Sequence, residues 1–262
     1  MKVITITKKG LLCVLACVII VAIIITVTTS TASQVVEASN TQRLIPIYYV
    51  DTKEKVCSIS FDAAWGNEQT AQLLDILDTY NVQTTFFLVG DWVDKYKKSV
   101  EEIAARGHDV GNHSNTHAHM TQLSKSEQLD EINECNKKIA EITKQDVTLF
   151  RPPYGEYDNS VVEVCKSADM HCVQWNIDSL DWKDPSPDDM VRRIEKNLCP
   201  GSIILLHNGA KNTPQALPKI IKAIHAQGYK IVPISKLLPK GEYTTDHEGK
   251  MICSTPDLSH TN

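Results

Sequence analysis

Apolar positions along the chain recur with two different periods. Short apolar runs rich in β-branched residues indicate buried strands, and longer stretches with apolar residues three and four apart indicate helices. The predicted strands cover residues 56–61, 84–89, 109–112, 147–150, 172–175, 203–206 and 229–232. The predicted helices cover residues 68–80, 93–106, 124–143, 160–169, 190–197 and 216–227. The third helix begins with Ser124-x-x-Glu127, the pattern of a capping box.

The regular alternation of strands and helices predicts an α/β fold with a parallel sheet, either open or closed into a barrel. A polar residue stands at, or just past, the carboxyl end of five different predicted strands: Asp62, His113, Arg151, Asp178 and His207. In a barrel the catalytic residues come from the ends of many strands and converge on one axis, whereas an open sheet binds its ligand at one switch point between strands. We therefore predict a (β/α) barrel.

A longer apolar run, residues 11–27, precedes the alternating part. Three lysines stand before this run and small polar residues follow it, so the first 32 residues have the pattern of an export segment. The run is longer than the usual core of a signal peptide and approaches the length that spans a bilayer, which favours an uncleaved membrane anchor. A signal peptide cleaved after Ala32 or Ala38 is the alternative. Both interpretations place the lysines inside and the rest of the chain outside.

The remaining chain divides into a predicted tether at residues 33–54, a folded domain at residues 55–238 and a polar tail at residues 239–262, which can form a hairpin around His247. Without its first 32 residues the chain has 24 basic and 32 acidic residues. Nucleic acids bind to clustered Lys and Arg, so this acidic body argues against a nucleic-acid partner.

Six cysteines lie outside the apolar run: Cys57, Cys135, Cys165, Cys172, Cys199 and Cys253. In an exported chain these six could form three disulfides. Four of them, however, fall in predicted strands and helices, where a free cysteine serves as a small buried hydrophobe. We predict free thiols, and because the sequence has no CxxC pair, a cysteine-based zinc site is not expected.

His113 and His117 are four residues apart, with small and polar residues between them. Both imidazoles can turn toward one divalent metal ion, and two neutral imidazoles with open positions would make a catalytic rather than a structural metal site. Such an ion polarises a carbonyl and lowers the pKa of its bound water. The alternative is a pair of surface histidines in a polar loop. His119 is either a spare ligand or a loop residue.

Asp62 follows a predicted buried strand, so its carboxylate would emerge into the same site as a general base, held ionised and oriented by Arg151. A helix cap is the alternative role for Asp62. In Arg151-Pro152-Pro153-Tyr154 the prolines stiffen the backbone, so the amide of Tyr154 could be aimed as an oxyanion donor.

Three carboxylates and an indole stand close together in the sequence: Asp178, Asp181, Trp182 and Asp184. Carboxylates beside an indole are typical of sites that bind sugar rings, and a solvated acidic turn is the alternative. His207 ends the predicted strand 203–206, where it could provide an acid opposed to the Asp62 base.

Four ordered motifs within residues 55–238 resemble those of the polysaccharide deacetylases of carbohydrate esterase family 4, the NodB-homology domain. The motifs are His113-Ser114-x-x-His117, Arg151-x-Pro153-Tyr154, Asp178-x-x-Asp181-Trp182-x-Asp184 and Leu205-x-His207. The resemblance implies a distorted (β/α)7–8 barrel, a zinc- or cobalt-type metal at the two histidines, and N-deacetylation of N-acetylated sugars.

The first family motif is different in this chain. Family members usually have Thr-Phe-Asp-Asp-Gly, in which the second aspartate is a metal ligand. Here the stretch is Ser60-Phe61-Asp62-Ala63-Ala64-Trp65-Gly66, so the base is kept and Ala63 replaces the ligand. This version resembles a subgroup of deacetylases associated with spore formation in Gram-positive bacteria. Three outcomes are open: Asp62 turns to the metal, water fills the gap, or the site is catalytically inactive.

We therefore expect an anchored or secreted extracytoplasmic hydrolase that releases acetate from N-acetylhexosamine residues of cell-wall glycan, with peptidoglycan as the first substrate. In this hypothesis Asp62 is the base, Asp181 supports His207 as the acid, and Trp182 and Leu205 line the acetyl pocket. The metal and the Tyr154 amide would stabilise the oxyanion. Two alternatives stay open: an inactive wall-glycan-binding pseudoenzyme and a metal-dependent O-acetyl esterase.

Overall fold

The structure is a computed structural model that describes residues 19–22 and 43–253. The chain divides into two units, Met1–Arg43 and Leu44–Asn262. In the first unit residues 19–22 are helical. The rest of the predicted membrane segment, both candidate cleavage positions and residues 33–42 of the predicted tether lie outside the described residues. Within the described ranges, no helix has both the length and the apolar composition needed to cross a membrane.

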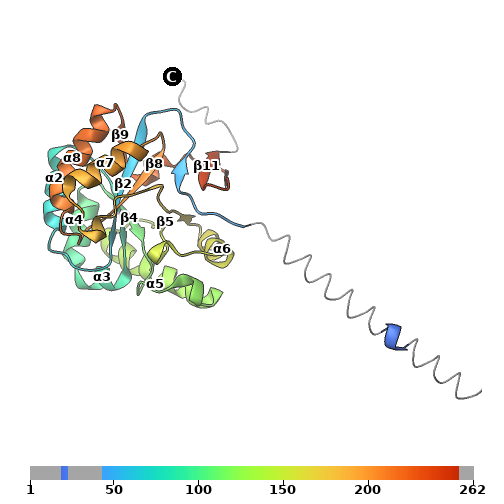
Figure 1. Cartoon of the computed structure of the whole chain (residues 1–262). Coiled ribbons are helices and arrows are strands. Elements are labelled where there is room, and N and C mark those ends of the chain that lie inside the picture. Colours follow the sequence, from blue (N-terminus) through green and yellow to red (C-terminus); the bar gives the residue numbers. More distant parts are fainter. Residues whose placement is uncertain (1–18, 23–42, 254–262) are drawn as a thin grey trace, which may run out of the picture. The chain divides into compact units, whose positions relative to one another are not determined.

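The second unit is built on a curled, mostly parallel sheet (Figure 1). Its strands are β1 (Tyr49–Val50), β2 (Val56–Ala63), β3 (Thr85–Leu88), β4 (Asp109–Asn112), β5 (Leu149–Phe150), β6 (His171–Cys172), β7 (Ile177–Asp178), β8 (Ser202–His207), β9 (Lys230–Ile231), β10 (Tyr243–Thr245) and β11 (Lys250–Cys253). The order along the sheet is β10-β11-β1-β8-β2-β3-β4-β5-β6, with β7 beside β8 and β9 beside β2. This arrangement confirms the α/β class and is consistent with a distorted barrel.

Helices and short turns connect the strands. The helices are α2 (Thr70–Thr79), α3 (Gly90–Lys95), α4 (Lys97–Ala105), α5 (Lys125–Thr143), α6 (Asn159–Ser167), α7 (Pro187–Asn197), α8 (Thr213–Ala226) and α9 (Ile234–Leu237). Three 3-10 turns are η1 (Met120–Gln122), η2 (Pro153–Gly155) and η3 (Asp181–Lys183). The predicted capping box is present, because the Ser124 side chain accepts from the Glu127 N–H and the Glu127 carboxylate accepts from the Ser124 N–H.

The prediction of one helix over residues 93–106 is wrong. The structure has two helices, α3 and α4, which meet at Tyr96. Tyr96 leaves the helical region at φ −127° and ψ 45°, and its ring packs on Trp92 at 5.2 Å between centroids. The break contains no Gly or Pro, and the apolar spacing continues across it. The sequence pattern therefore gives no sign that the helix is interrupted.

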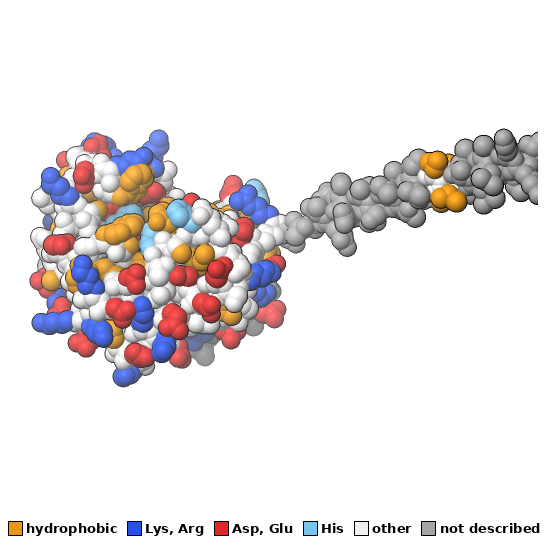
Figure 2. All heavy atoms as spheres, turned by 90° about the horizontal axis from the view of Figure 1, so that it is seen from below, with side chains coloured by type: hydrophobic (Ala, Val, Ile, Leu, Met, Phe, Trp, Pro, Cys, Tyr) orange, Lys and Arg blue, Asp and Glu red, His pale blue; other side chains and the backbone are white. Residues whose placement is uncertain are grey.

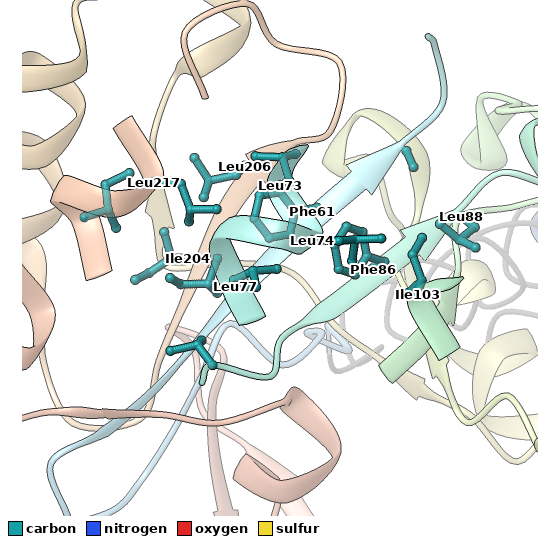
Figure 3. Packing of buried hydrophobic residues seen from close by; sticks show 14 of the residues in the cluster. Phe61, Leu73, Leu74, Leu77, Phe86, Leu88, Ile103, Ile204, Leu206 and Leu217 are labelled. Atoms are coloured by element: carbon teal, nitrogen blue, oxygen red, sulfur yellow. The ribbon is translucent and has the colours of Figure 1, made fainter. Parts of the chain in front are cut away.

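The largest hydrophobic core lies between the sheet and its helices (Figure 3). Phe61 and Phe86 stack at 4.9 Å between centroids, and Leu73 and Leu77 of α2 reach the same cluster. All four side chains are fully buried, and each such burial contributes roughly 1.5–3 kcal/mol. Strand side chains alternate between the two faces of a sheet, so the residue after Phe61 points away from this core.

The six cysteines outside the predicted membrane segment are free thiols, as predicted. Cys57, Cys135, Cys165 and Cys172 are buried. Burial raises the pKa of Cys57 and of Cys135 to about 12, so these thiols stay protonated and behave as small apolar side chains.

The first described residues of the second unit join distant parts of the sheet. Ile47 forms a parallel bridge with Val173, next to β6. Two residues further, β1 lies between β8 and β11. The β10–β11 hairpin turns near His247, as predicted, and its second strand pairs with β1 through Tyr49 and Lys250.

Candidate active site

The end of β2 divides its residues between the core and a pocket. Phe61 and Ala63 belong to the hydrophobic core, whereas Asp62 and Ala64 line the pocket. Ala63 is fully buried, and its carbonyl accepts a hydrogen bond from the Val89 N–H at 3.1 Å. The strand alternation therefore directs the side chain of residue 63 away from the pocket.

A buried ion pair holds the carboxylate of Asp62. The Arg151 guanidinium donates from Nη1 to Asp62 Oδ1 at 2.7 Å. Arg151 is itself fully buried, donates from Nη2 to the Gln174 carbonyl at 3.0 Å, and stacks over the Phe87 ring at 4.1 Å. Burial opposes ionisation of Asp62, but the positive charge and the hydrogen bond of Arg151 outweigh it and lower the pKa of Asp62. Asp62 is thus a carboxylate at neutral pH.

His113 follows the last residue of β4 and enters the site with a defined tautomer. Its Nδ1 lies 2.7 Å from the Arg151 carbonyl, which can only accept, so Nδ1 carries the proton. Nε2 is then left with its lone pair, 3.5 Å from Asp62 Oδ2. Burial lowers the pKa of His113, so the neutral ring is the stable form.

The turn after β4 brings His117 back beside His113. Ser114 and His117 both adopt left-handed backbone conformations, with φ of 66° and 59°. Glu131 of α5 fixes this turn, because its carboxylate accepts from the N–H groups of Asn115 and Thr116 at 2.8 Å each. Sequence reasoning missed Glu131, since nothing distinguishes it from the other acids of α5 in the sequence.

His117 lies among aromatic rings at the rim of the pocket. Its ring centroid is 5.1 Å from His113, 4.6 Å from Trp65 and 4.5 Å from Tyr154, all edge to face. Burial lowers the pKa of His117 to about 4, so it is neutral at neutral pH. Figure 2 shows histidine side chains reaching this surface between hydrophobic side chains. Trp65 was not predicted as a site residue.

The donor atoms of the two histidines fit a divalent metal ion. His113 has a free Nε2, its Nδ1 being held by a backbone carbonyl, which is how metal-binding histidines are usually oriented. His117 Nδ1 is buried and has no hydrogen-bond partner within the described part of the chain. In the same residues, no group of three or more His, Cys, Asp or Glu side chains is arranged to hold a metal ion. The chain thus offers two imidazoles and no third ligand at position 63.

Tyr154 lies on the neighbouring wall in a left-handed conformation, with φ of 60°. Its ring is half exposed and stacks on His119 at 4.2 Å between centroids and 11° between planes. The His119 ring is in turn 2.9 Å from a carboxylate oxygen of Glu156. His119 does not line the pocket, so it supports Tyr154 and is not placed as a spare metal ligand.

A second carboxylate–histidine pair, Asp181 and His207, contributes His207 to the wall of the pocket. Asp181 is fully buried and accepts from His207 Nδ1, from the His207 N–H and from the Thr213 hydroxyl, each at 2.7 Å. Burial opposes protonation of His207, but the hydrogen bond and charge of Asp181 outweigh it and raise the pKa of His207. Since Nδ1 is engaged, Nε2 is the ring nitrogen left for the pocket.

The pocket between these walls has a volume of about 700 Å³. It is lined by Asp62, Ala64, Trp65, His113, His117, Tyr154, Trp175, Asp178, Trp182, Asp184, Leu205, His207, Asn208, Gly209, Ala210 and Lys211. Every predicted site residue lines it except Arg151 and Asp181, which lie beneath it and hold Asp62 and His207. A carboxylate, three imidazoles and exposed aromatic rings therefore surround one ligand-sized space.

The named proteins that this chain resembles in sequence include deacetylases of peptidoglycan. A family model described as polysaccharide deacetylase matches residues 49–173. The chain is 34% identical to a peptidoglycan-N-acetylglucosamine deacetylase of Bacillus cereus, over 72% of this chain and 91% of that protein. It is 35% identical to the peptidoglycan-N-acetylmuramic acid deacetylase PdaC of Bacillus subtilis, over 72% of this chain and 40% of PdaC. It spans 60% of the uncharacterized protein YlxY of the same organism, at 30% identity.

Solved structures include both active and inactive proteins. A wild-type pseudoenzyme of the CE4 family from Bacillus anthracis matches with a TM-score of 0.72 and 36% identity, over 74% of this chain and 69% of that chain. A mutant of that pseudoenzyme with restored enzymatic activity matches equally well, at 37% identity.

Proposed function

Since this chain belongs to the polysaccharide deacetylase family, we propose that it is a hydrolase that releases acetate from N-acetylhexosamine residues of cell-wall glycan. One observation carries the proposal: a base and an acid of opposite pKa shift face one pocket from neighbouring strands. Asp62 and His207 are register partners in β2 and β8, and each is held by a buried ionic partner. This pairing provides the two proton transfers that amide hydrolysis requires.

In the proposed reaction Asp62 accepts a proton from the attacking water, whose oxygen bonds to the acetyl carbon. Arg151 keeps Asp62 ionised and oriented. Protonated His207, with Nδ1 bound to Asp181, gives the Nε2 proton to the nitrogen as the carbon–nitrogen bond breaks. The products are acetate and a free amino sugar. The backbone amide of Tyr154 acts as an oxyanion donor.

His113 and His117 would hold the metal ion, for which zinc or cobalt suits imidazole ligands. When bound, the ion polarises the acetyl carbonyl and lowers the pKa of water. Because Ala63 contributes no ligand, we expect weaker metal binding than at a site with three protein ligands.

Trp182 and Leu205 line the pocket beside His207 and are the proposed walls for the acetyl group. Peptidoglycan is the proposed substrate, because the named relatives act on its two amino sugars. The apolar run at residues 11–27 and the wall substrate together support an extracytoplasmic protein, anchored in the membrane or secreted. A role in spore formation is proposed from the form of the first motif.

A second candidate function is binding of wall glycan without turnover. The side chain at position 63 is buried in the core, and the described residues lack a three-ligand metal cluster. The similar Bacillus anthracis structure is a pseudoenzyme of the same family. These observations support a protein that keeps the glycan pocket and has lost catalysis.

Acetate release separates the candidates. The full-length protein in detergent would be incubated with peptidoglycan and with N-acetylglucosamine oligomers, after metal removal and with added zinc or cobalt. Metal-dependent acetate release that disappears in Asp62→Asn supports the deacetylase. Glycan binding without acetate release supports the pseudoenzyme, and release from O-acetylated but not N-acetylated substrates would identify an esterase.

A further inference from the structure

The loop between His113 and His117 has an unfavourable backbone. Ser114 and His117 both lie in the left-handed region, with φ of 66° and 59°, and neither residue is a glycine. Such conformations persist only where the surrounding structure fixes them. A free loop would leave them, and the His117 ring would then move with its backbone away from His113. The pairing of the two imidazoles therefore depends on the contacts that hold residues 114–117.

Glu131 of α5 provides more hydrogen bonds to this loop than any other described residue. Its Oε2 accepts from the N–H groups of Asn115 and Thr116, and its Oε1 accepts from the Thr116 hydroxyl, each at 2.8 Å. Hydrogen bonds to an ionised carboxylate are about twice as strong as bonds between neutral groups. All three bonds go to the two residues before His117, so Glu131 acts on that imidazole through the backbone.

The other side of the loop is held by the start of α3. The Gly90 N–H donates to the Ser114 carbonyl at 3.0 Å, and the next N–H of α3 donates to the Asn115 carbonyl at 2.9 Å. A Cβ at Gly90 would clash with the Asn115 side chain, so α3 is in close contact with the loop. The carbonyl groups of the loop are thus bound by α3, and its N–H groups at residues 115 and 116 are bound by Glu131.

Neighbouring acids of α5 lie near the loop without bonding to it. Asp130 and Glu134 line the same hollow beside the loop as Glu131, and both are exposed. Among the described residues neither of them has a hydrogen bond to the loop, whereas Glu131 has three. Negative charge is therefore common on this side of α5, and the bonds that fix the loop distinguish Glu131.

We propose that Glu131 is a positioning residue of the metal site, which fixes His117 beside His113 before the ion binds and so sets the affinity of the site. This inference rests on the metal site of the proposed function. Ala63 provides no ligand, so the affinity depends strongly on the two imidazoles, and ligands already in place bind without a further ordering cost. Groups that orient metal ligands typically contribute about 10–100-fold to metal affinity.

The test measures zinc affinity by calorimetry on the full-length protein in detergent. We expect Glu131→Ala to weaken zinc binding about tenfold, at the lower end of that range because Glu131 acts through the backbone. Glu131→Gln keeps a carbonyl oxygen for the two N–H groups and loses the charge, so its affinity should lie between those of Glu131→Ala and the wild type. Glu134→Ala removes an exposed acid of the same helix and hollow, and this matched control should bind zinc as the wild type does.

Hydrogen exchange separates positioning from a purely structural role. In the metal-free wild type the amides of Asn115 and Thr116 should already be protected, and added zinc should change their protection little. In Glu131→Ala the same amides should exchange rapidly without zinc and become protected with it, because the ion then orders the loop. A purely structural role would lower Tm and leave the zinc affinity unchanged.

Three results would overturn the proposal. Unchanged zinc affinity in Glu131→Ala, or an equal loss in Glu134→Ala, removes the positioning role and leaves the proposed function in place. Wild-type amides at residues 115 and 116 that become protected only with zinc would show that the loop is not formed beforehand, and this measurement does not depend on the folding of a variant. Wild-type protein that binds no zinc overturns this inference together with the proposed metal site.

Discussion

Replacing Arg151 with methionine removes the positive partner of a buried carboxylate. Arg151 has no exposed side-chain surface, and the Asp62 side chain is only 7% exposed. Methionine fills much of the same volume and still contacts Phe87, so the change acts mainly on the charge. Asp62 would then stay in a buried place with His113 and His207 as its remaining support.

The expected cost follows from the burial of this pair. Breaking a buried ion pair by removing one partner costs about 3–5 kcal/mol, because the other charge is left uncompensated. In a domain of this size each kcal/mol lowers Tm by about 2–4 °C, so we expect a decrease of roughly 6–20 °C at neutral pH.

The loss should depend on pH in a defined direction. In the wild type the pKa of Asp62 is lowered, so its ionisation adds stability above its ordinary pKa of 3.8, and this stability is lost as pH falls through the folded-state pKa. In Arg151→Met, burial prevails and raises the pKa of Asp62. The variant therefore loses stability as pH rises above the ordinary value. The difference in Tm between the two proteins should be small near pH 4 and largest near pH 7.5.

Thermal unfolding of metal-free protein at these two pH values measures both effects. Arg106→Met is the matched control, because Arg106 pairs with Asp75 and Asp78 on the surface, where such pairs contribute about 1 kcal/mol or less. A Tm change in Arg151→Met no larger than in the control would refute the buried-pair reasoning. A large change that is equal at both pH values would show that packing, not charge, is responsible.

Three further predictions concern the site. Asp181→Asn removes the charge that raises the pKa of His207, so the alkaline limb of the pH–rate profile should move to lower pH. If the protein has no turnover, the NMR titration of His207 should move in the same direction. An unchanged limb or titration would contradict the pairing of Asp181 with His207. His117→Ala should abolish zinc binding measured by calorimetry, and unchanged affinity would remove His117 from the metal site. Ala63→Asp places a carboxylate in the core and, without metal, should lower the free energy of unfolding by at least ~2 kcal/mol, measured by thermal unfolding. Added zinc should restore Tm only if the end of β2 rotates and turns the new carboxylate toward the pocket. An unchanged Tm without metal would show that the side chain at position 63 can leave the core.

The strand ends could be predicted from the sequence because parallel strands bring their carboxyl ends to one edge. Asp62, His113 and His207 each stand at the end of a predicted strand, and the structure brings all three to one pocket. The direction of Ala63 also follows from the alternation of β2, given that Phe61 is in the core. These features depend on the two-residue alternation of strand side chains and on the order of strands and helices, and both can be seen in the sequence.

Other features of the site and the fold depend on contacts between distant residues, which a local sequence pattern does not predict. The left-handed conformation of Tyr154 is uncommon for a residue with a side chain and is set by the surrounding turn. Trp65 reaches the pocket through the turn at Gly66 and through its own contact with Gly209, 144 positions away in sequence. β7 has two residues, too few to show a period. The division of α3 from α4 has no Gly or Pro signal.

The pairing of β1 with β11 also bears on how the chain folds during synthesis. Tyr49 pairs with Lys250, and the Tyr48 N–H donates to the Gly249 carbonyl at 2.8 Å. These partners are separated by about 200 residues, so closing this contact carries a high loop entropy and a high contact order. The strands β2 to β8 can associate while the chain is still growing. β1 can pair on both of its edges only after residue 250 has been synthesised, because one of its partners is β11. β1 should therefore be the last part of the sheet to acquire protection from hydrogen exchange.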